Sequence, residues 1–349
     1  MSTRRYAVIS PCRDEQDFLR RTLDSVLGQT EPPALWVMVD DGSTDATPQI
    51  LSEYADANPM IRIVTMPPRT TRVLGPAVVH AFNRGLEEVD LDDFDYVVKL
   101  DVDLELPPRY FELLMDHMEA DPRLASCSGT PCGRSDAGGL VPERGSAEIS
   151  AGMTKFYRVR AFQDIGGLAP VLMWDGIDCH TARVRGWRVR SFDEPGLRFE
   201  HLRPMGSSDR GILRGKRRHG HGQYLMGTHP LYLIASVARR LTDSPAIIGA
   251  LNILAGYVWA ALRGVPRHGT REFRRQVRQF QLESLYRGKT RAVEAWEWRQ
   301  QKEWDYKCAV GIGPAAIDRV ARGQRVDRSL SHRARVKRAR MRDTTDTPT

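Results

Sequence analysis

Short apolar runs alternate with segments of helical spacing over residues 6–120. The apolar runs are 6–9, 35–39, 61–64 and 96–100, and the helical segments are 15–27, 43–54, 76–86 and 107–118. A short apolar run bounded by turn-forming residues is typical of a buried strand. Because strands that alternate with helices form right-handed βαβ units, we predict a mainly parallel α/β sheet with helices on both faces.

Acidic residues follow two of these apolar runs directly. Asp40 and Asp41 end the second run, and Asp101 and Asp103 come just after the fourth. Open α/β sheets bind their ligands at the carboxyl ends of the strands. Carboxylates that converge there repel one another unless a cation or a ligand's hydrogen-bond donors hold them. The two clusters therefore predict a site for a metal ion and a nucleotide.

Composition restricts the class of protein only loosely. A chain of 349 residues with a net charge of +8 has room for one large domain and an appendage, and it suits an anionic partner such as a nucleotide, a phospholipid surface or nucleic acid. The five cysteines lack the spacing of a zinc site, so we expect free thiols in a reducing compartment. The first residues contain no apolar signal-peptide core, and we therefore expect a cytoplasmic protein.

The stretch 39–45, Val-Asp-Asp-Gly-Ser-Thr-Asp, followed later by Asp101-Val102-Asp103, resembles the family 2 glycosyltransferases of the GT-A fold. The resemblance covers residues 5–205. Pro11 and Glu15 after the first strand fit that family, although Arg13 and Asp14 replace its commoner Asn-Glu dipeptide. The resemblance implies a GT-A-like, Rossmann-type mixed sheet and a sugar transfer from a nucleoside-diphosphate sugar to an acceptor hydroxyl.

The same resemblance implies which residues bind the donor and the metal ion. The donor-binding positions are Pro11, Arg13, Glu15, Asp40, Asp41, Arg72, Gly75 and Asp101. Asp101, Asp103 and His201 are the implied ligands of Mg²⁺ or Mn²⁺, a cation that would stabilise the departing diphosphate. Two of these assignments have open alternatives, because Arg72 also suits a solvated surface and a single histidine such as His201 is often structural.

The catalytic base implied by the resemblance is Asp175, which stands eleven residues before the segment Gly186-Trp187-Arg188-Val189. The chain departs from the family pattern at Trp174, where an acidic residue is usual. Asp178 is therefore the reserve candidate for the base. A base on the face opposite the leaving diphosphate would make the transfer inverting.

Three regions follow from these patterns: a nucleotide-sugar-binding and catalytic domain over 1–205, a helical region over 206–315, and a basic, disordered tail over 316–349. The stretch 245–262 carries no charge and lies at the lower limit of membrane-spanning length. It fits a helix on the inner surface of the cell membrane, a helix of a soluble subdomain, or a span. The Gln-x-x-Arg-Trp motif of processive family members is missing, which favours single transfer.

Other classes of protein remain as alternatives. A nucleotidyltransferase would favour a glycine-rich basic loop after the first strand, but residues 10–15 contain no glycine. The basic tail fits a nucleic-acid-binding protein, yet it lacks interleaved aromatic residues, so we expect no nucleic-acid partner. An inactive relative of the family is disfavoured by the intact Asp-x-Asp. The family resemblance implies a glycan or lipid-linked acceptor, in cell-envelope glycan or glycolipid synthesis.

Overall fold

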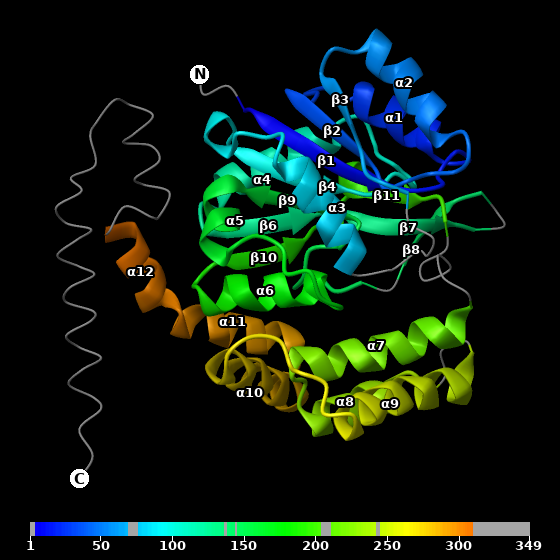
Figure 1. Cartoon of the computed structure of the whole chain (residues 1–349). Coiled ribbons are helices and arrows are strands. Elements are labelled where there is room, and N and C mark those ends of the chain that lie inside the picture. Colours follow the sequence, from blue (N-terminus) through cyan, green and yellow to red (C-terminus); the bar gives the residue numbers. More distant parts are fainter. Residues whose placement is uncertain are drawn as a thin grey trace.

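The computed structural model describes residues 4–68, 76–135, 138–143, 145–203, 211–241 and 245–309. Its centre is a seven-stranded sheet with the strand order β10-β6-β9-β4-β1-β2-β3 (Figure 1). The strands are β1 Tyr6–Cys12, β2 Leu35–Asp40, β3 Ile61–Thr65, β4 Tyr96–Leu100, β6 Leu124–Ser128, β9 Thr154–Arg158 and β10 Arg188–Ser191. Only β9 runs antiparallel to its neighbours within this sheet. The predicted mixed, mainly parallel sheet is confirmed, as are the four predicted strands.

Helices cover both faces of this sheet because the strand residues are apolar on both sides. Tyr6 and Val8 of β1 point to the face covered by α1 (Leu19–Leu27), α2 (Thr47–Ala57) and α4 (Tyr110–Ala120). Ala7 and Ile9 point to the opposite face, which α3 (Pro76–Leu86) and α5 (Val159–Ile165) cover. Successive side chains of a strand alternate between faces, so a continuous apolar run such as β1 fits a doubly covered sheet.

The first and second predicted helices begin later than expected. The segment predicted as a helix from 15 becomes helical only at Leu19, because Glu15 makes a turn in which its carbonyl accepts the backbone N–H groups of Phe18 and Leu19 at 3.1 and 2.9 Å. The next helix begins at Thr47, whose N–H donates to Asp45 Oδ1 at 2.9 Å. Both segments before these helices form the loops at the carboxyl ends of β1 and β2.

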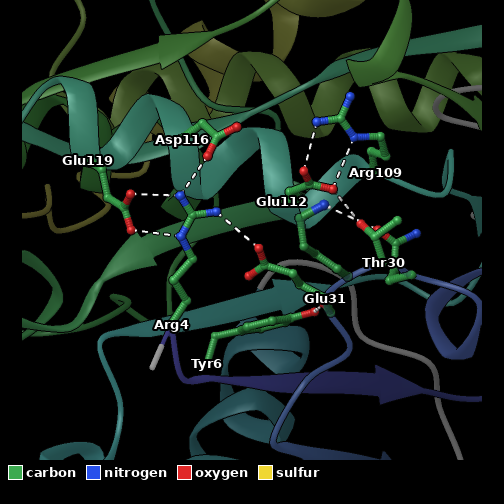
Figure 2. A network of polar contacts seen from close by, with 10 residues as sticks. Arg4, Tyr6, Thr30, Glu31, Arg109, Glu112, Asp116 and Glu119 are labelled. Carbon is green, nitrogen blue, oxygen red and sulfur yellow. Dashed lines mark hydrogen bonds and ion pairs between the residues drawn. The ribbon is translucent and has the colours of Figure 1, made fainter. Parts of the chain in front are cut away.

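A polar network fixes α4 at the other edge of the sheet, where β1 begins (Figure 2). Arg4 donates to Glu119 Oε1 at 2.9 Å and to Asp116 Oδ1 at 2.7 Å, both on α4, and to Glu31 Oε1 at 3.1 Å. The Tyr6 hydroxyl donates to the Glu31 carbonyl at 2.6 Å. The network links β1, α4 and the loop before β2 on the side of the sheet away from the acidic clusters.

A second, smaller sheet has the order β5-β11-β7-β8. Its strands are β5 Leu104–Glu105, β11 Arg198–His201, β7 Thr130–Arg134 and β8 Leu140–Pro142. Much of residues 126–145, where the many Gly, Ser and Pro residues favour a loop, is therefore strand. The small residues serve close packing instead: a Cβ added at Gly129 would lie 1.9 Å from the Leu197 carbonyl oxygen.

The chain after Gly211 forms helices that lie together beyond α6 (Trp174–Val184) (Figure 1). They are α7 Ile212–Met226, α8 Pro230–Arg239, α9 Ala246–Leu262, α10 Arg271–Arg287, α11 Lys289–Arg299 and α12 Gln301–Ala309. Ile177 of α6, Met226 of α7 and Val277 of α10 form one buried cluster. Within the described ranges, no helix is long and apolar enough to cross a membrane. The tail predicted over 316–349 lies outside the described residues.

Two glycines allow α7 and α9 to touch backbone to backbone. A Cβ added at Gly256 would lie 1.9 Å from the Arg217 carbonyl oxygen, and one at Gly220 would lie 1.8 Å from the Ile253 carbonyl oxygen. We expect Gly256→Ala to lower the free energy of unfolding by about 1–3 kcal/mol, because the two backbones must separate. Gly176→Ala in α6 is the matched control, since its new Cβ would meet only Met226 Sδ at 3.8 Å. Urea denaturation of both variants measures the difference, and equal stability would contradict the assigned crossing.

Candidate active site

The loops after β1 and β2 meet at one edge of the large sheet. Cys12 at the end of β1 is in register with Asp40 at the end of β2, and the Asp41 N–H donates to the Cys12 carbonyl at 2.9 Å. Asp40 is buried, and its Oδ1 accepts the Ser43 N–H at 2.9 Å. Because β4 pairs in parallel with β1, its end and Asp101 lie at this same edge. The predicted placement of both acidic clusters at one sheet edge therefore agrees with the strand register.

The residues after β1 are tied to neighbouring loops. Pro11 lies within β1, and the Arg13 Nε lies 3.7 Å from Asp14 Oδ2. Asp14 has a left-handed backbone with φ of 54°, and its Oδ1 accepts the Thr44 N–H at 2.7 Å. The buried carboxylate of Glu15 forms an ion pair with Arg203. Glu15 thereby connects the β1 loop to the segment that follows β11.

A cavity of about 730 Å³ opens beside these loops. Carboxylates, two histidines and cations from distant parts of the chain share its wall: Lys99, Asp101, Asp103, Asp175, His201, Arg203, Lys216, Arg218, His219 and Arg240. Three of the predicted site carboxylates and the predicted histidine thus face one space. Asp40 and Asp41 are not among the described residues that line it, and Arg72 and Gly75 lie outside the described residues.

Asp101 directly follows the end of β4 and lies beside a buried lysine. Lys99 forms an ion pair with Asp101 and donates to the Gly152 carbonyl at 2.9 Å. Burial raises the pKa of Asp101 and the neighbouring charge of Asp103 adds to this, while Lys99 acts in the opposite direction. The carboxylate of Asp101 is therefore held in place by Lys99 and would be favoured in its ionised form by a further positive charge.

Asp103 and His201 stand side by side. His201 Nε2 lies 3.7 Å from Asp103 Oδ2, and His201 Nδ1 lies 3.1 Å from Glu143 Oε2. Burial disfavours the charged forms of both the Asp103 carboxylate and the His201 ring, but the contacts between these charged groups outweigh burial. They lower the pKa of Asp103 and raise that of His201 to about 9. Arg203 Nε is a further cation, 3.8 Å from Asp103 Oδ2.

The donor set of this pair fits a divalent cation. Metal-binding histidines commonly donate their second ring nitrogen to a carboxylate, and Glu143 occupies that position on His201. A carboxylate oxygen and an imidazole nitrogen are acceptable ligands for Mn²⁺, and Mg²⁺ is commonly held by few protein carboxylates together with phosphate oxygens. No group of three or more His, Cys, Asp or Glu side chains within the described ranges could hold a metal alone. A cation held by this pair would therefore need further ligands.

Asp175 lies in the first turn of α6, behind Met173, whose backbone is left-handed with φ of 63°. Asp175 lines the cavity and lies close to Gly152, since a Cβ added at Gly152 would lie 3.1 Å from Asp175 Oδ2. The Gly152 carbonyl in turn accepts a hydrogen bond from Lys99, the partner of Asp101. An ionised carboxylate is stabilised at a helix N-terminus. Asp175 is thus a half-buried carboxylate on the wall of the cavity.

Asp178, the reserve candidate for the base, is buried among internal donors. Its oxygens accept Lys155 Nζ at 2.6 and 2.7 Å and the Cys179 N–H at 2.7 Å. Burial disfavours the ammonium of Lys155, but the ion pair with Asp178 outweighs it and raises the pKa of Lys155. Asp178 therefore serves to neutralise Lys155, which favours Asp175 as the base.

Two lysines and a tryptophan explain the departure from the family pattern at position 174. Lys99 and Lys155 are directly opposite each other on β4 and β9. Trp174 lies against both, with Lys99 Nζ 5.2 Å and Lys155 Nζ 5.6 Å from its ring centre. The aromatic face attracts both ammonium groups, so Trp174 adds to the ion pairs that Lys99 and Lys155 make with Asp101 and Asp178.

Removing the buried cation should destabilise the fold. We expect Lys155→Met to lower the free energy of unfolding by roughly 3–5 kcal/mol, because Asp178 is left buried without its partner. The double variant Lys155→Met/Asp178→Leu should recover most of the loss, since neither charge remains. Thermal and urea unfolding compare the two, and a double variant less stable than Lys155→Met would contradict this account.

Sequence reasoning missed several residues that the structure brings to the site: Lys99, Glu143, Arg203 and Arg240. Lys99 had a usable signal, because it is the one charged residue in the apolar run 96–100. Glu143 had no such signal, since nothing in the sequence indicates that the residue after β8 lies beside His201 at the end of β11. Arg203 follows the predicted His201 closely, but an arginine just after a strand is also typical of a solvated surface.

The fold and the site together define an α/β domain with carboxylates at one edge of its sheet and a cavity beside them. The family model described as glycosyl transferase family 2 matches residues 7–172. Residues 7–172 are therefore similar to glycosyl transferase family 2, in agreement with the resemblance noted from the motifs.

Individual relatives match parts of the chain. It is 31% identical over 134 residues to the uncharacterized glycosyltransferase YibD of Escherichia coli K12, covering 38% of this chain and 36% of that protein. It is 32% identical over 101 residues to the candidate teichuronic acid biosynthesis glycosyltransferase TuaG of Bacillus subtilis 168, covering 28% and 40%. The chain thus spans less than half the length of these curated relatives.

Among solved structures, the chain is similar to the mannosyltransferase PcManGT from Pyrobaculum calidifontis, determined in complex with GDP-Man and Mn²⁺. The identity is 19%, the TM-score is 0.47, and the match covers 86% of this chain and 87% of that one.

Proposed function

We propose that this protein is an inverting, metal-dependent glycosyltransferase that moves a sugar from a nucleoside-diphosphate sugar to an acceptor hydroxyl in single transfers. The observation that carries the proposal is one cavity lined both by the Asp103–His201 pair and by Asp175. The similarity to family 2 supports the reaction class. A cell-envelope glycan or glycolipid is the proposed product, in line with the name of the relative TuaG.

The donor lies, in this proposal, along the carboxyl ends of β1, β2 and β4. Asp40 and Asp41 accept hydrogen bonds from the base and ribose, as the family resemblance implies, and Asp101 lies at the junction with the diphosphate. Arg203 bridges Glu15 and Asp103, so it keeps the two halves of the donor site in register. Arg13, Arg72 and Gly75 remain predicted donor-binding positions.

Asp103 and His201, with Asp101 nearby, would hold Mg²⁺ or Mn²⁺. When bound, such a cation offsets the negative charge that develops on the departing diphosphate. Asp175 accepts the proton of the acceptor hydroxyl as that oxygen attacks the anomeric carbon, and the diphosphate leaves from the opposite face. Lys99 holds Asp101 in position and thereby orients the wall that faces Asp175.

A donor-hydrolysis screen tests the reaction class. Purified full-length protein is incubated with a panel of UDP-, GDP- and dTDP-sugars and either Mg²⁺ or Mn²⁺, and release of nucleoside diphosphate is measured. We expect release from one donor class, abolished by EDTA and restored by added cation. Release of pyrophosphate from nucleoside triphosphates, with none from any nucleotide sugar, would instead identify a nucleotidyltransferase.

A further inference from the structure

An exposed apolar face runs along α8 and α9. The side chains of Ile247, Leu251 and Leu262 on α9 are 61%, 54% and 84% exposed, and Leu231 and Ile234 of α8 are also exposed. Large apolar side chains that gather on the surface of a protein mark a site of interaction with another molecule or a membrane.

The opposite side of α9 packs against the rest of the protein. Gly249, Ile253, Gly256 and Ala260 recur at helical spacing and are buried, with Gly256 against the backbone of α7. The exposed set Ile247, Leu251, Val258 and Leu262 is displaced from this buried stripe around the helix. The apolar residues of the exposed set therefore do not contribute to the packing of the core.

Two arginines lie beside this face, in a segment of the chain that is basic as a whole. The segment 211–270 contains eight Lys and Arg residues and one acidic residue, Asp243. Arg217 and Arg263 lie over the ring of Trp259, with their guanidinium carbons 6.0 and 5.4 Å from its centre. Trp259 itself is partly exposed beside Val258. Arginines that surround an exposed Trp and several aliphatic residues are typical of a helix that lies in a membrane interface.

We propose that α8 and α9 dock this face on the surface of an anionic lipid bilayer, with the helices lying in the plane of the interface. Charge complementarity selects this occupant. A second copy of the chain would bring one arginine rim against another. The segment 310–349 is also a poor occupant, because it carries ten Lys and Arg residues against four acidic ones. Nucleic acid would satisfy the arginines but leave the aliphatic side chains in water.

The helices that carry the docked face also contribute to the catalytic cavity. Lys216 and His219 of α7 line that cavity together with Ile253 of α9 and Arg240 at the end of α8. The helices that would contact lipid therefore also form one wall of the cavity. Docking would present the cavity to acceptors held at the lipid surface, a consequence that rests on the proposed transferase function, whereas lipid binding itself does not.

Vesicle flotation of the full-length protein tests the docking surface. The vesicles are phosphatidylcholine alone or a 7:3 mixture with phosphatidylglycerol. We expect the protein to float with the mixed vesicles and at least about tenfold less with the neutral ones, since each basic residue near an anionic surface contributes about 1 kcal/mol. The triple variant Ile247→Ser/Leu251→Ser/Leu262→Ser should lose flotation, and Arg263→Glu/Arg267→Glu should lose the preference for anionic lipid.

The matched control is Tyr286→Ser/Trp298→Ser, which removes two highly exposed aromatic side chains from α10 and α11 and should leave flotation unchanged. Thermal unfolding verifies that each variant is folded, and donor hydrolysis without lipid reports the proposed function separately. Flotation of the folded triple variant at wild-type level would overturn the proposal. So would a wild-type dimer in gel filtration that the triple variant converts to monomer without any flotation of either.

Discussion

Asp175→Asn should abolish sugar transfer while leaving the affinity for the nucleotide sugar close to that of the wild type. The substitution keeps the shape of the side chain but removes its basicity, and a positioned carboxylate supplies typically ~10²–10⁴-fold in rate through proton transfer. Donor binding should persist because the carboxylates assigned to the donor and the cation come from β1, β2 and β4, whereas Asp175 lies on α6. Turnover with saturating acceptor and isothermal titration with donor measure the two effects.

Asp178→Asn is the comparison for that experiment. Its side chain is three residues away and is buried against Lys155, so its loss should lower stability while turnover per folded molecule changes far less. Turnover is therefore normalised to the folded fraction, measured by circular dichroism at the assay temperature. An inactive, fully folded Asp178→Asn beside a normally active Asp175→Asn would place the base three residues later than we assign it.

The catalytic half of the fold could be predicted because its signals are local. The run 35–39 followed by Asp40 and Asp41, and the run 96–100 followed by Asp101, each specify a strand and what stands at its end. Parallel pairing then brings the ends together without further information. The strands β6, β7 and β8 could not be found this way, since Gly129 and its small neighbours are selected by contacts with residues far along the chain.

The same contrast holds within the site. Asp101, Asp103, Asp175 and His201 belong to short motifs, and all four line one cavity. The pairing of Lys99 with Lys155 depends on the antiparallel insertion of β9 beside β4, which no motif in the chain indicates. Basic residues of α7 also line the cavity, and two glycines let that helix cross α9 closely. Tertiary packing, rather than local sequence, decided these contributions.

Asp103→Ala should remove the dependence of donor binding on the cation. In Mn²⁺ the wild type should bind its donor much more tightly than in EDTA, because a bound cation contributes several kcal/mol of charge stabilisation. The variant should show the same weak affinity under both conditions, since the side chain nearest His201 Nε2 is gone. Titration calorimetry with donor, in each buffer, measures the loss.

A graded series separates ligation from mere packing at this site. Glu143→Gln keeps the size of a side chain that contacts the far nitrogen of His201, so it should weaken the cation affinity by roughly 10–100-fold without abolishing it. His201→Ala should fall between Glu143→Gln and Asp103→Ala, and Mn²⁺ electron paramagnetic resonance can rank all three without any enzyme assay. If Asp103→Ala binds Mn²⁺ and donor as the wild type does, the Asp103–His201 pair is an ordinary ion pair of the fold, and the cation, if the reaction uses one, is held by other residues.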